Sequence, residues 1–231
     1  MKSSIPAGNR RFGGELPPLV LAALALVLTG CSSDGNAEWQ GIYQTAKSAF
    51  QKAPVVTLDQ AAAIPFATLG VTVDDGQEMI AVLATANGGQ QLWASGKTVT
   101  LVTIDGRIQR TVGLAHNLSW STITPAAPGH GPLEDWQTPR RVTWTDDYNE
   151  TGQYSVQIVC DERPTRNEQI MILGQSISTL RIDATCRSAQ LNWTFKDVYW
   201  VGRPDGVVWR SVQYIHPKLG PVVLETLRPP G

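Results

Sequence analysis

The chain has 231 residues, of which 42% are hydrophobic and 17% are charged, and its formal net charge is −1. This composition supplies enough apolar side chain for a substantial core, which excludes a disordered tether. No basic patch stands out along the chain, which argues against nucleic acid as a partner.

The first thirty residues have the organisation of an export signal. Lys2, Arg10 and Arg11 precede an uncharged apolar run at 19–28. That run is too short to cross a bilayer, which takes about 20 apolar residues. A basic stretch followed by a short apolar run and small residues is typical of a signal peptide. We therefore predict that residues 1–30 are a signal peptide of the general secretion route.

Cys31 directly follows Leu28, Thr29 and Gly30. This segment resembles the lipobox of bacterial lipoproteins, in which the cysteine becomes the first mature residue and carries a diacylglyceryl group and a further acyl chain such as palmitate. Several acyl chains, at about 0.8 kcal/mol per buried methylene, make a stable anchor. Ser32 stands where an Asp would favour the inner membrane, so we predict an outer-membrane anchor facing the periplasm. A signal peptide that happens to contain a cysteine is the alternative.

Residues 31–36 are predicted to form a short lipidated tether that keeps the domain against the membrane. Apolar side chains then recur at helical spacing before Pro54, and they predict one amphipathic helix that begins near Ala37. Its apolar face consists of Trp39, Ile42, Tyr43, Ala46 and Phe50. This helix packs on its own domain or binds a partner. Thr57 to Gln60 resembles a capping box and predicts one further helical turn, stopped by Pro65.

The hydrophobic period changes to two from Ala67 onwards, which predicts β-strands. Tight turns are marked by the pairs Asp75-Gly76, Asn87-Gly88 and Asp105-Gly106. Residues 125–139 contain four prolines and are predicted to be a long loop or a boundary. The predicted strands before this loop are 67–74, 77–86, 90–95, 98–104 and 107–114. Those after it are 141–145, 153–160, 169–173, 178–186, 190–201, 207–215 and 222–227.

A pattern recurs at an offset of 100 residues. Trp93 and Trp193 each precede an Asp-Gly pair by the same distance, namely Asp105-Gly106 and Asp205-Gly206. An internal duplication and a chance match of generic hairpins both explain it. The predicted boundaries are 37–231 for one periplasmic β-rich domain, with candidate repeat halves at 64–120 and 140–228. The expected fold is mainly β, with antiparallel meanders that form a sandwich or a barrel.

Cysteine usage agrees with an extracytoplasmic location. With Cys31 assigned to lipidation, Cys160 and Cys186 remain, and an even pair in an oxidising compartment predicts a disulfide. A metal site is a weaker interpretation, because none of the three histidines lies close to either cysteine in the sequence. We therefore predict neither a metal nor any other cofactor.

The sequence offers little for catalysis. His116, His130 and His216 are isolated from one another, and no serine lies in a Gly-x-Ser-x-Gly motif. A triad assembled from distant residues stays open, since triads are spatial arrangements. We predict that the protein is not an enzyme and that it has no catalytic residues.

Two acidic clusters support an alternative, a periplasmic enzyme that modifies polysaccharide. They are Asp74-Asp75 and Asp146-Asp147 with Glu150. A retaining glycosidase needs two carboxyl groups about 5 Å apart. Both clusters fall at predicted turns, where Asp is favoured because it bonds to the local backbone. We therefore interpret them as solvated turns.

Tryptophan is the unusual residue of this chain, which contains eight. Flat aromatic faces stack on sugar rings, whereas tryptophans within strands usually belong to the core. Trp120 and Trp136 lie beside or inside irregular segments. We therefore predict these two as the candidates for stacking on a sugar.

Several segments resemble the YjbF/GfcB family of lipoproteins, which are associated with group 4 capsule and exopolysaccharide operons. The most specific are Gly106 to Leu114 and Gly206 to Gln213, and Ile64 to Leu69 and Leu227-Arg228-Pro229 agree as well. The resemblance covers nearly all of the mature chain. It implies a β-rich fold and an outer-membrane lipid anchor, and it implies no catalytic residues.

The resemblance also implies a role in the secretion of an extracellular polysaccharide. The expected function is that of a non-enzymatic accessory factor for binding or assembly. Its expected partners are an outer-membrane β-barrel export protein, other periplasmic products of the same operon, and the polysaccharide. A periplasmic polysaccharide-modifying enzyme and a purely structural envelope lipoprotein are the alternatives.

Overall fold

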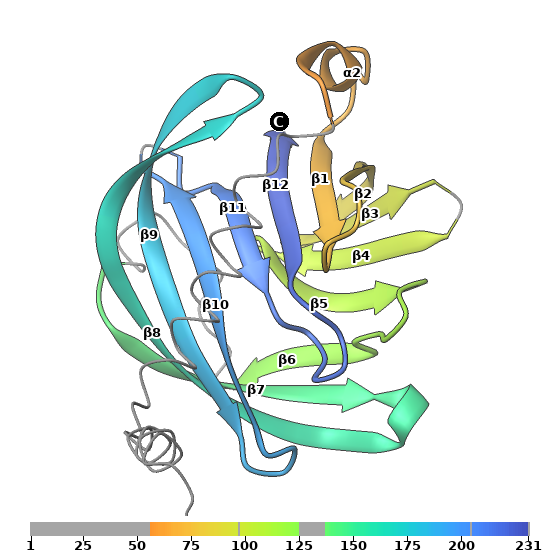
Figure 1. Ribbon diagram of the computed structural model, residues 1–231, viewed down its shortest axis with the longest axis vertical. Coiled ribbons are helices and arrows are strands. Elements are labelled where there is room, and N and C mark those ends of the chain that lie inside the picture. Colours follow the sequence, from red (N-terminus) through yellow and green to blue (C-terminus); the bar gives the residue numbers. More distant parts are fainter. Residues whose placement is uncertain (1–55, 97, 125–136, 204, 231) are drawn as a thin grey trace, which may run out of the picture. The chain divides into compact units, whose positions relative to one another are not determined.

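Figure 1 shows a computed structural model of the chain, which describes residues 56–96, 98–124, 137–203 and 205–230. The predicted signal peptide, the tether with Cys31, the predicted amphipathic helix and Trp136 lie outside the described residues. Among the residues that are described, no helix is long and apolar enough to cross a membrane.

One antiparallel sheet of twelve strands forms a nearly closed barrel, which decides between the two predicted architectures. The strand order is β5-β4-β3-β2-β1-β12-β11-β10-β9-β8-β7-β6. The helical elements are α2 (Leu58–Ala62) and η2 (Asn149–Thr151). The strands are β1 (Thr68–Val73), β2 (Met79–Asn87), β3 (Gln90–Ser95), β4 (Val99–Ile104), β5 (Arg107–Val112), β6 (Trp120–Thr124), β7 (Arg140–Tyr148), β8 (Gln153–Ile172), β9 (Gln175–Ser188), β10 (Trp193–Gly202), β11 (Val208–Gln213) and β12 (Val222–Arg228).

The barrel consists of two meanders that join where β1 pairs with β12. At the opposite side the edge strands β5 and β6 approach each other (Figure 1). The backbone N–H of Thr111 donates to the carbonyl oxygen of Leu118 at 2.9 Å, and the N–H of Leu118 donates to Thr111 Oγ1 at 2.9 Å. These bonds lie just outside β6, so the two edge strands of the sheet are joined beside this point.

Successive side chains of a strand point to opposite faces of a sheet. In β4 the exposed fractions of Val99, Leu101 and Thr103 are 8%, 1% and 1%, while the residues between them are partly exposed. β7 and β12 alternate in the same way, and together with the buried residues of the other strands they fill the barrel interior with an apolar core. Its largest fully buried side chains are Trp93, Tyr148 and Tyr199.

The helical turn predicted from the capping box is confirmed as α2. The backbone N–H of Gln60 donates to Thr57 Oγ1 at 3.2 Å, and the backbone N–H of Thr57 donates to Gln60 Oε1 at 2.9 Å. Each bond satisfies an N–H that the first turn of a helix leaves without an intrahelical partner.

Two strand predictions were wrong. The segments 153–160 and 169–173 belong to one strand, β8, because a register shift between Pro164 and Arg166 absorbs the proline without ending the strand. The short strand β6 was not predicted, since Trp120 was interpreted as lying beside an irregular segment.

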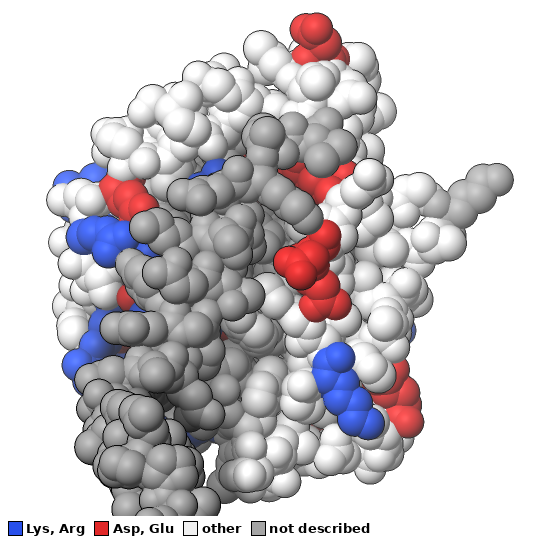
Figure 2. All heavy atoms as spheres, viewed as in Figure 1, with Lys and Arg blue, Asp and Glu red and all other residues white. Residues whose placement is uncertain are grey.

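Charged residues at outward positions of β7 to β10 form interleaved ion pairs. Arg141 and Arg187 both contact Asp161, and Lys196 contacts Asp183 at 2.8 Å. Figure 2 shows Lys and Arg side chains gathered on the side of the molecule where β8 and β9 lie. Exposed pairs of this kind contribute only about 0–1 kcal/mol each.

Candidate functional site

A pocket with a volume of about 240 Å³ lies in the barrel between the β4–β5 turn and the β10–β11 connection, and we call it the mouth pocket. Buried inward-facing side chains of β1, β3, β4, β11 and β12 form its floor. The two Asp-Gly pairs, Asp105-Gly106 and Asp205-Gly206, form part of its rim. The ends of β-barrels are a common place for ligand sites.

The Asp105-Gly106 turn lies against the first residue of β11 at the mouth pocket. Gly106 has a φ of +75°, and a Cβ there would lie 2.5 Å from the Cβ of Val208. Only glycine therefore fits at this contact. The side chain of Gln213 holds the turn in place, because its Nε2 donates to the carbonyl oxygen of Gly106 at 2.7 Å and its Oε1 accepts from the N–H of Ile108 at 2.9 Å.

A chain of hydrogen bonds orients the amide of Gln91 in the mouth pocket. The indole N–H of Trp93 donates to Thr103 Oγ1 at 2.9 Å, and that hydroxyl donates to Gln91 Oε1 at 3.3 Å. Because the amide oxygen is the acceptor in this chain, the amide nitrogen supplies donors. None of the described residues accepts a hydrogen bond from it. The amide is therefore positioned to donate to a ligand.

The carboxylate of Asp205 is also held in one orientation. The backbone N–H of Val207 donates to its Oδ1 at 3.0 Å, and the indole N–H of Trp209 donates to its Oδ2 at 3.2 Å. Asp105 brings a second carboxylate to the pocket, and among the described residues that line it there is no Lys or Arg. The mouth pocket therefore contains two carboxylates, and that of Asp205 is held in one orientation.

A buried ion cluster occupies the barrel interior and involves β5, β7, β8 and β10. Arg107, with 3% of its surface exposed, pairs with Glu162, which is 2% exposed. Arg140 Nε contacts the other oxygen of Glu162 at 2.6 Å. The Arg107 guanidinium lies over the rings of Tyr199 at 4.5 Å and Trp144 at 5.0 Å. Burial alone would raise the pKa of Glu162, but the two arginines outweigh it and hold the pKa below its usual value.

Two more carboxyl groups, those of Asp146 and Asp197, line a cavity of about 40 Å³ beside this cluster. Burial raises the pKa of Asp146 to about 6, against hydrogen bonds from Ser121 and Tyr148. Burial raises the pKa of Asp197 to about 7, against a hydrogen bond from the N–H of Tyr214. A cavity of this size holds about one to three water molecules. It excludes a sugar.

We expect Asp197→Asn to flatten the dependence of stability on pH. A carboxyl whose pKa is raised by folding stabilises the native state below its unfolded pKa, and this stability is lost as pH rises through about 7. Between about pH 5.5 and pH 8 the ionisation of Asp197 should lower the free energy of unfolding by about 2 kcal/mol. Urea denaturation at several pH values measures the slope. An unchanged slope in the variant would show that Asp197 ionises as it does in the unfolded chain.

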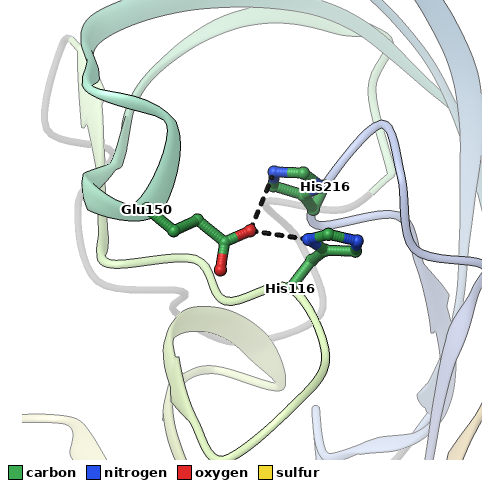
Figure 3. Close-up of side chains that lie close together, drawn as sticks. All are labelled: His116, Glu150 and His216. Carbon is green, nitrogen blue, oxygen red and sulfur yellow. Dashed lines mark hydrogen bonds and ion pairs between the residues drawn. The ribbon is translucent and has the colours of Figure 1, made fainter.

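His116, Glu150 and His216 meet at three connections between strands, as Figure 3 shows. Glu150 Oε1 lies 2.7 Å from His116 Nδ1 and 3.5 Å from His216 Nε2. The two imidazole rings stack with their centroids 4.7 Å apart. The hydrogen bond from His116 is the main cause that lowers the pKa of Glu150. Burial lowers the pKa of His216, which is 1% exposed, and so favours the neutral ring.

These three residues are the described group that comes nearest to a metal site, since their ligand atoms lie within 4.8 Å of one another. The backbone N–H of Lys218, however, donates to His216 Nδ1 at 3.0 Å. The neutral ring then carries its proton on Nε2, the atom that would have to bind the metal. A histidine ligand normally donates from its other nitrogen instead of accepting there. The group is therefore better suited to joining the three connections by hydrogen bonds than to binding a metal.

The structure brings some predicted site residues together and separates others. Cys160 and Cys186 form a disulfide between β8 and β9. Trp120 is 37% exposed on β6 and does not line the mouth pocket. The interpretation of Asp146-Asp147 as a solvated turn was wrong, because both residues lie in β7 and Asp146 points into the barrel. His116 and His216 are distant in sequence but adjacent in space, and no local sequence motif indicates their contact.

The fold and pocket define a class of protein, a nearly closed antiparallel barrel with a polar pocket at its mouth. The chain belongs to the family described as "Group 4 capsule polysaccharide lipoprotein gfcB, YjbF", which matches residues 24–227. This confirms the family that the sequence segments resembled. The family description makes the chain a capsule-related lipoprotein, and lipoprotein relatives imply a membrane-anchored protein of the cell envelope.

Two relatives from Escherichia coli (strain K12) are similar along almost their whole length. The "Uncharacterized lipoprotein GfcB" is 26% identical over 219 residues, covering 92% of this chain and 98% of that protein. The "Uncharacterized lipoprotein YjbF" is 26% identical over 226 residues, covering 89% of this chain and 94% of that protein. These names indicate no enzymatic activity.

A solved structure shares the fold. The crystal structure of the hypothetical lipoprotein YmcC from Escherichia coli (K12) superimposes with a TM-score of 0.60 at 23% sequence identity. The match covers 82% of this chain and 95% of that chain. The barrel is therefore the fold of an experimentally determined lipoprotein as well.

Proposed function

We propose that the protein is an outer-membrane lipoprotein that acts as a non-enzymatic accessory factor in the secretion of capsular or extracellular polysaccharide, and that it binds the polymer. The observation that carries the polymer-binding part is the mouth pocket. Its pre-oriented Gln91 amide and the oriented carboxylate of Asp205 are suited to the hydroxyl groups of a sugar. The family description supports the link to capsule polysaccharide.

Binding without cleavage is supported by the positions of the titratable groups. A glycosidase needs a carboxylic acid with a raised pKa beside the scissile bond and a second carboxylate facing it. The carboxyls whose pKa is raised to about 6 and about 7, Asp146 and Asp197, line the small cavity of about 40 Å³. The mouth pocket and this cavity share no described lining residue. Asp205 in turn already accepts two hydrogen bonds that hold its own turn.

The proposed location rests on Cys31 and the residue after it. Lipidation of Cys31 would hold the barrel beside the membrane through a short tether, and Ser32 favours the outer membrane. At the periplasmic face of that membrane, the protein would contact an outer-membrane β-barrel export protein and other periplasmic products of the operon. We therefore expect the protein to act beside such an exporter.

Two variants at the lipidation site should distinguish the need for a lipid anchor from the need for an outer-membrane location. Cys31→Ala should release the protein into the soluble periplasmic fraction and lower the amount of polysaccharide at the cell surface. Ser32→Asp should keep the lipid but move the protein to the inner membrane, with a similar loss of surface polysaccharide. Membrane fractionation and quantification of surface polysaccharide in a complemented deletion strain measure both effects.

Three outcomes would contradict the proposal. Full secretion with Ser32→Asp would argue against an outer-membrane site of action. Cross-linking that recovers no outer-membrane protein with the native chain would argue for a purely structural lipoprotein. Cleavage of the purified polymer by the protein, lost on substitution of Asp146, would favour the enzyme instead.

A further inference from the structure

We infer that the end of the barrel that carries α2 docks on the surface of a lipid bilayer, and that the side chains of Leu58 and Phe66 insert into its interface. This inference rests on the proposed lipidation of Cys31 and adds a second membrane contact and an orientation to it. The docking surface, which we call the α2 end, comprises residues 57–66, the segment that leads into β1. Figure 1 shows α2 at one end of the barrel.

The α2 end exposes several apolar side chains. Leu58 is 53% exposed and Phe66 is 61% exposed. Between them in the sequence, Ala62, Ala63 and Pro65 are exposed as well. Residues 57–66 contain a single charged side chain, that of an aspartate in the first turn of α2. Exposed apolar surface of this kind marks a site for a membrane or for a protein partner.

Hydrogen bonds within the barrel satisfy backbone groups of the α2 end. The guanidinium of Arg228, at the end of β12, donates to the carbonyl oxygens of Ala62 and Ile64. The N–H of Ala63 donates to the carbonyl oxygen of Asp59 at 3.0 Å. A backbone polar group without a partner is costly in contact with lipid, so these bonds lower the cost of docking. Arg228 also fixes the α2 end to the barrel wall.

A bilayer is the occupant that the chain itself brings to this surface. Residues 32–55 connect Cys31 with Val56, and α2 is the first described element after them. With the lipid of Cys31 in the membrane, α2 is the described element that lies closest to the anchor along the chain. A second contact within a tethered molecule is intramolecular, so insertion of two side chains is enough to orient the barrel.

This orientation would bring the mouth pocket close to the membrane. Pro230 lines that pocket and lies two residues after Arg228, which is at most about 7 Å of extended chain. Arg228 in turn binds the end of α2. The pocket that we propose to bind the polymer would therefore face the zone that the polymer must cross.

The test uses the lipidated mature chain in vesicles of phosphatidylethanolamine and phosphatidylglycerol, with a nitroxide attached to the cysteine of Phe66→Cys. Cys160 and Cys186 form a disulfide and do not take the label. Power-saturation EPR compares collisions with oxygen, which concentrates in the bilayer, with collisions with a water-soluble nickel chelate. At position 66 the label should collide more with oxygen than with the chelate.

Tyr154→Cys is the matched control, because Tyr154 is an aromatic residue of nearly the same exposure, 59%. It lies at the start of β8, beside the connection from β7 that Figure 1 shows well away from α2. The same label there should favour the chelate. Equal preferences at positions 66 and 154 would overturn the inference. Shielding of position 66 from both reagents would also overturn it, because a protein segment or a second copy would then cover the α2 end.

A second label position tests the inserting side chains themselves. A nitroxide at Ala63→Cys should also favour oxygen in the lipidated chain. Leu58→Ser combined with Phe66→Ser should reduce the ratio of oxygen to chelate collisions at position 63 to the value found with Tyr154→Cys. All three positions are exposed, so the unfolding midpoint should stay unchanged. A ratio that the two serines leave unchanged would contradict the role assigned to Leu58 and Phe66.

The two proposals fail in different experiments. Retention of Cys31→Ala in the membrane fraction would contradict the proposed anchor. Loss of surface polysaccharide in Cys31→Ala, together with a label at position 66 that favours the chelate, would leave the proposed accessory role standing and overturn only the docking of the α2 end.

Discussion

Glu162→Gln should lower the free energy of unfolding by roughly 3–5 kcal/mol, the effect expected when one partner of a buried ion pair is removed. Arg107 is 3% exposed and pairs with Glu162 inside the barrel, and Arg140 shares the same carboxylate. The neutral amide would leave both guanidinium groups without that negative charge. Chemical denaturation measures the shift in the midpoint.

Asp161→Asn is the matched control for this variant. Asp161 is the preceding residue of β8, but its side chain points outward and pairs with Arg141 and Arg187, which are 64% and 55% exposed. Loss of this surface pair should cost less than about 1 kcal/mol. Equal losses in the two variants would contradict the assignment of Glu162 to the interior. Arg107→Met combined with Glu162→Gln should recover part of the stability, because the buried cation that has lost the Glu162 carboxylate is then removed as well.

The ion cluster could not be predicted from the sequence. The charged segment Asp161-Glu162-Arg163 indicates an interruption between two strands. A fully buried Glu is also rare, so the sequence favours an exposed position for Glu162. Because β8 continues past Cys160, its alternation places Glu162 on the inner face. Its partner Arg107 lies in β5, far from Glu162 in the sequence. Such a contact depends on how the sheet closes, which no local pattern records.

Turn residues predicted their local backbone conformation correctly at one position and wrongly at another. Asp105-Gly106 was predicted as a tight turn, and both residues have a positive φ in the structure, which is the conformation that this pair favours. The same reasoning failed at Asp146, since Asp is common in turns but is also accepted inside a barrel when its oxygens have partners. Ser121 and Tyr148 provide those partners.

The mouth pocket was indicated only indirectly. The offset of 100 residues marked Asp105-Gly106 and Asp205-Gly206 as related positions, yet it did not show that both line one pocket. Their common position follows from the curvature of the sheet, which brings the β4–β5 turn and the β10–β11 connection to one end of the barrel. Periodicity predicts the strands, but the closure of a sheet is a property of the whole chain.

Replacement of both Cys160 and Cys186 by alanine should lower the free energy of unfolding by about 3.5 kcal/mol, the chain-entropy value for a loop of this length. The two residues are direct partners in the register of β8 and β9, and both are 2% exposed or less. Alanine is the better replacement, because a buried serine hydroxyl without a partner would add its own penalty. Denaturation midpoints with and without a reductant measure the effect.

The control for the disulfide is Cys31→Ala, which removes a cysteine that the pairing does not use and should leave the midpoint unchanged. A midpoint that does not respond to reductant would contradict a formed disulfide. The comparison also bears on the compartment, since disulfides persist in the periplasm and are rare in the cytosol. Chain retained in the cytosol should therefore unfold as the alanine variant does, whereas exported chain should keep the additional stability. Export would then provide both the lipid anchor and the cross-link that stabilises the barrel.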